Sequence, residues 1–222
     1  MKKQIITTAD GSKTIYFPDW NESYHSKHGA IQEAKHVYIK SGLDYWLKSN
    51  NDKSLRLLEI GFGTGLNAFL SCIYASENSL KLNYHSIEKY PLDAITLNDI
   101  NYDKLIDSES SLFYDLHQSA WEVETQINTQ FYLKKIKTDL LTFDTQDKYD
   151  VIYFDAFGPQ VQPELWAKPI LEKLYNMMSN HSIWVTYSCK GSVRRDLQSI
   201  GFEVEKIPGP PGKREMLRAF KF

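Results

Sequence analysis

The sequence predicts an α/β fold in which a mostly parallel sheet of seven strands is covered by helices on both faces. Three observations predict it. Short apolar runs alternate along the chain with segments whose apolar residues recur at helical spacing. The run at residues 55–60 leads directly into three closely spaced glycines and then into a helical pattern. The last two strand patterns, 202–207 and 216–222, are joined only by a loop, which predicts an antiparallel pair.

The length and composition indicate one folding unit. A chain of 222 residues suffices for one core domain, residues 51–222, with an N-terminal hairpin and helix extension, residues 1–50. The net charge of −2 gives no overall basic footprint, so a nucleic-acid partner needs a local patch. Cys72 and Cys189 show no metal-ligand spacing, and we expect neither a metal site nor a disulfide framework. The absence of a signal peptide and of a bilayer-length apolar run predicts no membrane contact and a cytoplasmic location.

The N-terminal extension precedes the glycine-rich unit. Residues 3–17 predict a hairpin, because Asp10 and Gly11 form a turn signal between two apolar runs. The polar and aromatic stretch 19–29 predicts a loop, and residues 30–47 predict a helix. We interpret the histidines of this region as hydrogen-bonded or solvated, because no cysteine or carboxylate cluster completes a metal site around them. They are His25, His28 and His36.

The glycine-rich unit predicts a binding site for a nucleotide-like ligand. Its glycines allow a tight turn and close approach of a ligand to the backbone, beside the free N–H groups of the following helix. Leu66 stands where a dinucleotide fingerprint requires its third glycine. Glu59 at the strand end suits the positive ammonium and sulfonium of S-adenosylmethionine (SAM) and would repel a pyrophosphate. A NAD or FAD site and a turn without ligand remain the alternatives. The candidate cofactor residues here are Glu59, Gly61, Phe62, Gly63, Thr64, Gly65 and Asn67.

Acidic residues follow three further predicted strands, where ligands bind in open α/β sheets. Glu88 follows strand 80–87 and suits the two ribose hydroxyls, with an ordinary charged residue at a strand end as the alternative. Asp139 follows strand 131–136, a half-exposed strand by its alternation of apolar and basic residues. Asp139 can accept from the adenine amino group beside Leu140, or cap the next turn.

Asp155 follows the buried strand 149–154 and occupies the same edge of the sheet. The remaining stretches complete the alternation of helices and strands, and the glycine and proline residues of the loop 208–215 make a stiff basic connection. These remaining stretches are a helical stretch with an irregular middle at 91–125, a helix at 163–178, a strand at 183–188 and a helix at 192–200.

The Glu-x-Gly-x-Gly-x-Gly pattern resembles the first motif of Rossmann-like SAM methyltransferases. More specifically, the chain resembles the methyltransferase part of the MnmC family, also found as a stand-alone enzyme often called MnmD. The similarity covers most of the chain. The matching stretches are 29–34, 59–67, 88–91, 155–159, 163–166, 193–198, 201–202 and 212–217. The chain departs from the family at Ala156, where members often have Gly, and at Gln32, where they tend to have Glu.

The resemblance implies a reaction. It is methyl transfer from SAM to the primary amine of 5-aminomethyl-2-thiouridine at the tRNA wobble position, giving 5-methylaminomethyl-2-thiouridine. The partner would be the anticodon stem-loop of tRNA. Two-domain members also carry an FAD-dependent oxidase, but this chain has neither the length nor a second glycine fingerprint for one. Lys89, beside Glu88 in a matching stretch, joins the candidate cofactor residues.

The chemistry of amine methylation assigns roles to further residues. Asp155 is assigned to binding and positioning the amine, with general-base catalysis and a turn-capping role as alternatives. Aromatic walls for a flipped base are expected from Tyr24 and Phe157. Glu33 is assigned to the substrate side, and the candidate phosphate contacts are Arg194, Arg195, Lys213 and Arg214. A SAM methyltransferase of a small molecule or protein, and a non-catalytic sensor module, are the rival hypotheses.

Overall fold

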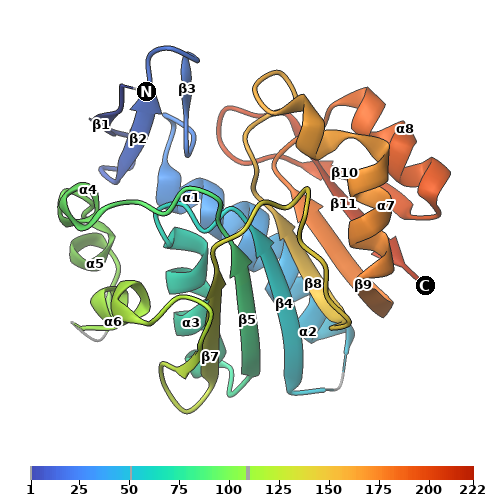
Figure 1. Cartoon of the computed structure of the whole chain (residues 1–222), viewed down its shortest axis with the longest axis horizontal. Coiled ribbons are helices and arrows are strands. Elements are labelled where there is room, and N and C mark those ends of the chain that lie inside the picture. Colours follow the sequence, from blue (N-terminus) through green and yellow to red (C-terminus); the bar gives the residue numbers. More distant parts are fainter. Residues whose placement is uncertain (1, 51, 109–110) are drawn as a thin grey trace.

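The computed structural model describes residues 2–50, 52–108 and 111–222 and shows a central sheet between two layers of helices (Figure 1). Within these residues the sheet has eight strands in the order β10-β11-β9-β8-β4-β5-β7-β6. The strands are β4 Ser54–Ile60, β5 Lys81–Ile87, β6 Glu124–Gln126, β7 Phe131–Ile136, β8 Tyr149–Phe154, β9 Met178–Thr186, β10 Glu203–Pro208 and β11 Glu215–Lys221.

The strand directions confirm the predicted topology and add one strand to it. Strand β4 pairs in parallel with β5 and β8, and the parallel arrangement continues to β7 and β9. Strand β11 runs antiparallel to both β9 and β10, as the closing pair was predicted to do. The prediction of seven strands was wrong by one. The extra strand, β6, has only three residues and pairs with the edge strand β7, so it carries no periodic pattern that a sequence could reveal.

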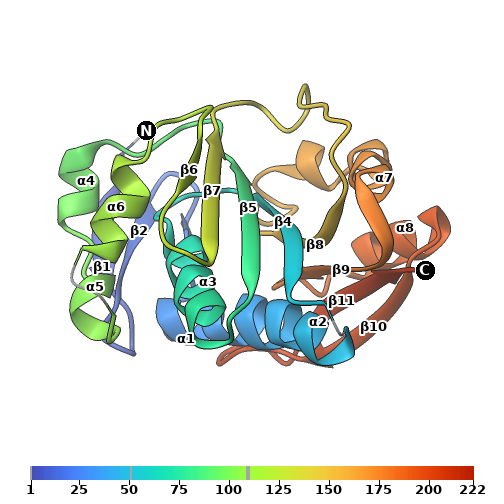
Figure 2. The ribbon, with the colours of Figure 1, turned by 90° about the horizontal axis from the view of Figure 1, so that it is seen from below.

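Two hydrophobic cores lie on the two faces of the sheet, because side chains of a strand point alternately to opposite faces. Leu57 packs into one core and Leu58 into the other. Figure 2 shows the helices of residues 30–77 lying along one face. These are α1 Ala30–Ala34, η1 Lys35–Leu43, α2 Asp44–Ser49 and α3 Leu66–Glu77, and the opposite face carries η2 Pro163–Trp166, α7 Lys168–Asn176 and α8 Gly191–Ile200.

The predicted helix at 30–47 is present, but its middle is a π-helix, η1. Gly42 in this segment packs against β8. A Cβ atom at Gly42 would lie 2.9 Å from Cε1 of Tyr153, so only glycine allows this approach. Wide turns of this kind are frequent at functional sites, and η1 carries Tyr38, whose hydroxyl contacts a carboxyl group of the cavity described below.

Two predicted helical stretches are interrupted. Residues 163–178 do not form one helix, since η2 ends at Trp166 and α7 begins at Lys168. Pro169 lies in the first turn of α7, where its missing N–H has no cost, and it thereby favours a new helix start. The stretch 91–125 contains short helices instead of one long helix, and its last two residues belong to strand β6. The short helices are α4 Ala94–Asn98, α5 Tyr102–Leu105 and α6 Leu112–Gln118.

The N-terminal hairpin is present as β1 Gln4–Thr7 and β2 Lys13–Phe17. A two-residue third strand, β3 Glu22–Ser23, extends it within the stretch predicted as a loop. The hairpin turn is fixed to helix α1, because the Oδ2 atom of Asp10 accepts from the Gln32 backbone N–H at 3.0 Å. This contact holds the small sheet over the carboxyl edge of the central sheet (Figure 1). The described part of the chain contains no helix that is long and apolar enough to cross a membrane.

Candidate active site

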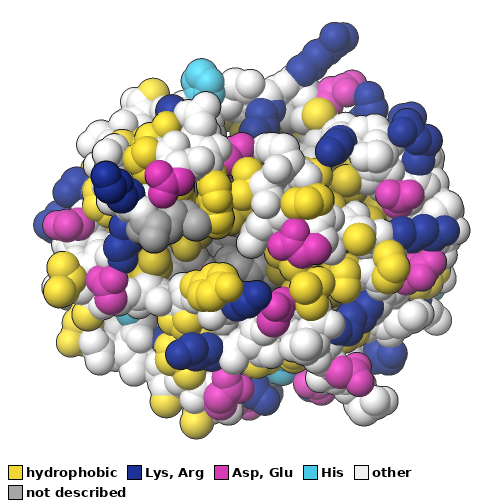
Figure 3. Space-filling model, turned by 45° about the horizontal axis from the view of Figure 1, so that its top comes forward, with side chains coloured by type: hydrophobic (Ala, Val, Ile, Leu, Met, Phe, Trp, Pro, Cys, Tyr) yellow, Lys and Arg dark blue, Asp and Glu magenta, His cyan; other side chains and the backbone are white. Residues whose placement is uncertain are grey.

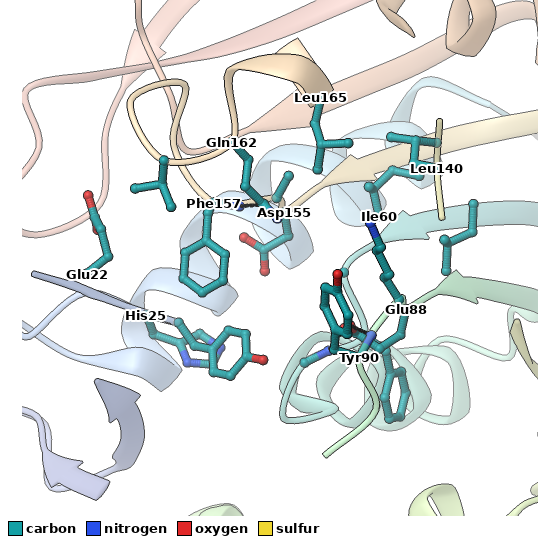
Figure 4. A pocket seen from close by; sticks show the side chains of 18 of the residues that line it. Glu22, His25, Ile60, Glu88, Tyr90, Leu140, Asp155, Phe157, Gln162 and Leu165 are labelled. Carbon is teal, nitrogen blue, oxygen red and sulfur yellow. Dashed lines mark hydrogen bonds between the residues drawn. The ribbon is translucent and has the colours of Figure 1, made fainter. Parts of the chain in front are cut away.

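A cavity of about 700 Å³ lies at the carboxyl ends of β4, β5, β7 and β8, partly covered by the N-terminal sheet. Hydrophobic side chains gather in the middle of this face, with acidic and basic side chains around them (Figure 3). Asp155 divides the cavity into two ends (Figure 4). The glycine end includes Ile60, Glu88, Tyr90 and Leu140, and the aromatic end includes Glu22, His25 and Phe157.

The glycine turn forms one wall of the glycine end. Gly61 and Phe62 both donate their backbone N–H to the carbonyl of Ile87, at 2.9 and 3.3 Å, so the turn is tied to β5. Gly61 has φ +96°, and a Cβ atom there would lie 2.9 Å from the carbonyl oxygen of Asp155. Both its conformation and this close approach require glycine. The predicted residues that line the cavity here are Gly61, Phe62, Gly63, Thr64 and Asn67.

Gly65 and Glu59, also predicted to contact the cofactor, do not line the cavity. Gly65 is the N-cap residue that precedes helix α3. Glu59 points to the same face of the sheet as Leu57 and is fully buried. Its Oε2 atom accepts from the Ser86 hydroxyl at 2.6 Å, and burial raises its pKa to about 8. The predicted contact of Glu59 with a cationic ligand is therefore corrected. This buried carboxyl group links β4 to β5 through its hydrogen bond with Ser86.

Glu88 is held in place by two backbone groups. Its Oε2 atom accepts from Gly63 N–H at 3.0 Å and its Oε1 atom from Tyr90 N–H at 2.8 Å. Each oxygen keeps a second lone pair for a ligand hydroxyl. Lys89 forms an ion pair with Asp139 at 2.7 Å, and this hydrogen bond lowers the pKa of Asp139. Lys89 and Asp139 thus reach the cavity as a pair, next to the buried Leu140.

Two residues behind the glycine turn were not predicted. Burial lowers the pKa of His117 to about 4, so its imidazole is neutral, and its Nε2–H donates to the Thr64 carbonyl at 3.2 Å. The Lys135 ammonium donates to the carbonyls of Leu116 and His117 at 3.0 and 2.8 Å. The alternation in strand β7 had suggested that its basic residues are exposed, but Lys135 is 1% exposed. Its face of the strand is covered by α6, whose carbonyl groups satisfy the ammonium.

Asp155 is the carboxyl group at the centre of the cavity. The Tyr38 hydroxyl donates to its Oδ1 atom at 2.5 Å, and the Asn67 side chain donates to its Oδ2 atom at 2.8 Å. Burial raises its pKa to about 7, and the negative charge of Glu33 adds to this shift. The Tyr38, Asn67 and Lys213 groups act in the opposite direction. Asp155 therefore changes its ionisation near neutral pH, as suits a group that exchanges protons.

Aromatic rings form the wall of the other end. Tyr24 and Phe157 stack with centroids 5.3 Å apart and planes 23° apart, so they form one wall together rather than two opposite walls. The rings of Trp20 and Phe17 contact Phe157 edge-on. The backbone of Phe157 is fixed, because Trp166 Nε1–H donates to its carbonyl at 2.7 Å. This end therefore presents a rigid aromatic face.

Three charged or aromatic groups meet beside that wall. Glu33 accepts from the Lys213 ammonium at 2.8 Å, and the same ammonium lies 3.9 Å from the centroid of the Tyr187 ring. Tyr187 was not predicted, because its strand pattern gives no sign that it faces a cavity. Of the candidate phosphate contacts, only Lys213 lines the cavity, while Arg194, Arg195 and Arg214 lie outside it.

The N-terminal histidines are hydrogen-bonded or exposed to solvent, as predicted. Nδ1 of His25 lies 2.9 Å from the Thr14 hydroxyl oxygen, and Nε2 of His36 lies 2.8 Å from the carbonyl oxygen of Pro208. His28 packs against Gly212. The described ranges 2–50, 52–108 and 111–222 contain no cluster of His, Cys, Asp or Glu that could hold a metal ion.

Comparison with known proteins places this geometry in a family. Residues 103–222 match a family described as S-adenosyl-L-methionine-dependent methyltransferase. The chain belongs to this methyltransferase family. A crystal structure of MnmC2 from Aquifex aeolicus superposes with a TM-score of 0.82 at 27% identity, covering 99% of this chain and 70% of that chain.

Curated relatives of the methyltransferase include the "tRNA 5-methylaminomethyl-2-thiouridine biosynthesis bifunctional protein MnmC" of two Leptospira species. The Leptospira interrogans protein is 31% identical over 218 residues, and the Leptospira borgpetersenii protein is 30% identical over 217 residues. Each match covers 89% of this chain and 32% of the relative. The chain thus spans about a third of the length of these relatives.

The cofactor of the methyltransferase is SAM, and the glycine end has the chemistry to hold it. The turn brings the backbone close to a ligand without an intervening Cβ, and Glu88 offers carboxylate lone pairs suited to a pair of ribose hydroxyls. The paired Asp139 and the apolar Leu140 offer an acceptor and a packing surface of the kind an adenine needs. These individual contacts were predicted from the sequence and remain predictions.

Proposed function

We propose that this methyltransferase methylates the primary amine of 5-aminomethyl-2-thiouridine at the wobble position of tRNA, forming 5-methylaminomethyl-2-thiouridine. The names of the curated relatives and the likeness to MnmC2 support this acceptor. The observation that carries the proposal is the position of Asp155, a carboxyl group between the glycine turn and a rigid aromatic wall. A cytoplasmic location follows from a tRNA acceptor and is part of the same proposal.

Asp155 handles the proton of the acceptor. An alkyl amine is mostly protonated at neutral pH and has no free lone pair for attack. The Asp155 carboxylate binds the ammonium through charge-assisted hydrogen bonds, oriented by Tyr38 and Asn67. Because its pKa is about 7, it can also accept the proton that the nitrogen releases. SAM supplies the methyl group on its positive sulfur.

The aromatic end receives the base. The face formed by Tyr24 and Phe157 stacks on a pyrimidine that has been turned out of the anticodon loop. Arg194, Arg195 and Arg214 are the proposed contacts to tRNA phosphates. The hydrogen bond from Lys206 lowers the pKa of Glu215, and the positive charges of Arg214 and Arg194 add to this shift, so both arginines lie near the same part of the surface.

The test uses tRNA from cells that lack the final methylation. It is incubated with the purified protein and labelled SAM, digested, and its nucleosides are identified by mass. We expect conversion of the aminomethyl nucleoside to the methylaminomethyl nucleoside, and a loss of roughly 10²- to 10⁴-fold in rate for Asp155→Asn. The same variant should still bind SAM, because Asp155 lies apart from the ribose and adenine positions.

The rival acceptor is the amine of a small molecule or protein. One observation favours it, because the carboxylates of Asp155 and Glu33 attract any alkylammonium that reaches the cavity. Absence of the methylated nucleoside, with SAM binding intact, would contradict the tRNA proposal and support this one. Methylation of tRNA that weakens steeply with added salt, and weakens less steeply in Arg194→Gln or Arg214→Gln, would exclude it.

A further inference from the structure

Glu33 and Tyr187 form a cation site within the cavity. The carboxylate of Glu33 and the face of the Tyr187 ring converge on one position, occupied by the Lys213 ammonium at 2.8 Å from Oε1 and 3.9 Å from the ring centroid. Glu33 is 6% exposed, and its other oxygen accepts from the Ser26 N–H at 2.7 Å. A fixed carboxylate and an aromatic face are the two groups that bind ammonium ions well.

Lys213 reaches this site on an ordered loop. Its N–H donates to the Pro210 carbonyl at 2.9 Å, and Gly209 donates to the Arg214 carbonyl at 3.2 Å. Gly212 adopts φ +85°, and His28 fills the space where its side chain would be. The loop therefore presents Lys213 at a small cost in conformational entropy. A lysine held in this way points its charge at the cavity rather than at an external phosphate.

Charged and titratable groups from several elements lie around Asp155, including the Tyr84 and Tyr102 hydroxyls, whose pKa values its charge raises after the larger effect of burial. Glu33 on α1 raises its pKa by its negative charge, and Lys213 opposes this shift. Tyr38 on η1 and Asn67 on α3 stabilise the carboxylate by hydrogen bonds. Two further groups lie nearby: Glu59 on β4 is coupled to Asp155 by charge, and the Tyr187 hydroxyl donates to the Ala156 carbonyl at 2.9 Å. Lys213 is the cation of this set.

We propose that Lys213 is a built-in counter-ion of the active site. Its ammonium, held between Glu33 and the Tyr187 ring, offsets the negative charge of Glu33 near Asp155, so that a larger fraction of Asp155 is ionised and can bind the acceptor ammonium and take its proton. This makes Lys213 a positioning residue and replaces its predicted role as a phosphate contact. The inference rests on the proposed role of Asp155 in amine methylation. It implies that a small alkylammonium can occupy the same cation site when the lysine side chain is removed.

The test is chemical rescue, and the quantity measured is the titration midpoint of Asp155 in the free enzyme. The protein is labelled with ¹³C at aspartate carboxyl groups, and the Asp155 signal is identified by its loss in Asp155→Asn. In Lys213→Ala we expect the titration midpoint of Asp155 to rise by roughly half a pH unit or more. Methylammonium chloride should lower the midpoint of Lys213→Ala toward the wild-type value and should lower the wild-type midpoint less, because Lys213 already occupies the cation site there, whereas sodium chloride at equal ionic strength should have no such effect.

Lys206→Ala is the matched control. Lys206 forms an ion pair of 2.7 Å with Glu215 at 38% side-chain exposure, similar to the 34% of Lys213, but neither partner lines the cavity. Its removal should leave the Asp155 midpoint unchanged. Lys213→Gln removes the charge while keeping a donor for Glu33, and Lys213→Arg keeps the charge. If circular dichroism shows that Lys213→Ala does not fold, these two variants replace it in the measurement of the Asp155 midpoint.

An Asp155 midpoint that stays at the wild-type value in both Lys213→Ala and Lys213→Gln would overturn the proposal. A raised midpoint that methylammonium does not lower would overturn the cation site. Neither measurement involves tRNA, so failure of the proposed acceptor appears only in the nucleoside assay and is distinguished from failure of this inference.

Discussion

The two ends of the cavity are built in different ways. The glycine end comes from strand ends of one sheet, and its residues follow directly on β4, β5 and β7. The aromatic end combines the N-terminal sheet, helix α1, the segment after β9 and the β10–β11 loop. Its ion pair joins Glu33 and Lys213, which are 180 residues apart in the chain. The glycine end is therefore a property of neighbouring strand ends, whereas the aromatic end depends on the N-terminal extension packing against segments that follow other strands of the sheet.

This difference separates cofactor binding from acceptor binding. Changes behind the glycine turn should alter the affinity for SAM and leave the ionisation of Asp155 unchanged. Changes around Asp155 should alter methyl transfer and its pH dependence while SAM still binds. The following substitutions test this separation, beginning with the largest expected effect.

Gly61→Ala should affect both ends at once. Gly61 has φ +96°, and the new Cβ atom would meet the Asp155 carbonyl at 2.9 Å, so the turn and the strand that carries Asp155 must move apart. The strain is roughly 1–3 kcal/mol, and it should lower SAM affinity on the order of tenfold to a hundredfold, measured by calorimetry. Gly191→Ala is the control, because its Cβ would meet only a flexible guanidinium at 3.4 Å. Unchanged SAM affinity in Gly61→Ala would show that the turn does not hold the cofactor.

The two ends also differ in how far the sequence predicts them. Glu88 and Asp155 were found because a parallel strand places its next residue at the binding edge, a rule that needs only local pattern. The same rule failed at Glu59, since it does not say to which face a residue inside the strand points. Lys135 was misjudged for a related reason. Its run was interpreted as an alternation of apolar and basic residues, although a period of two places Lys135 on the same face as Phe131 and Leu133, the face that α6 covers.

The aromatic end shows a different limit. Tyr38 lies in a helical pattern that indicated only core packing, and its contact with Asp155 spans 117 residues. Tyr187 and Lys213 also reach the cavity through tertiary packing of separate segments. Local periodicity contains no information about such tertiary contacts. Tyr24, Glu33 and Phe157 were assigned there by chemistry and by family resemblance rather than by pattern.

Tyr38→Phe should change the pH dependence of methyl transfer without changing SAM affinity. The Tyr38 hydroxyl stabilises the ionised form of Asp155, so its loss raises the Asp155 pKa further above about 7. Activity requires the carboxylate and therefore rises as pH increases through this pKa. The rising limb should move to higher pH by about one unit, which lowers the rate at pH 7 roughly fivefold. Full activity should return near pH 9.

Tyr45→Phe is the control for this measurement. Its ring packs on Arg218 and Phe220, away from the cavity, so its profile should match the wild type. A uniform loss of rate at all pH values in Tyr38→Phe would contradict the assignment, because it would indicate that Tyr38 acts on geometry alone.

His117→Ala should have the smallest effect, confined to the glycine end. The imidazole donates to the Thr64 carbonyl at 3.2 Å, and its Nε2 atom lies 2.9 Å from the position of a Cβ on Gly65. Its removal leaves a gap behind the turn, and we expect SAM affinity to fall severalfold, since one neutral hydrogen bond contributes about 1 kcal/mol. The Asp155 midpoint should not move. The exposed His181, replaced by Ala, provides the control. A shift of the Asp155 midpoint in His117→Ala would show that the two ends are coupled through the turn, and the separation drawn above would fail.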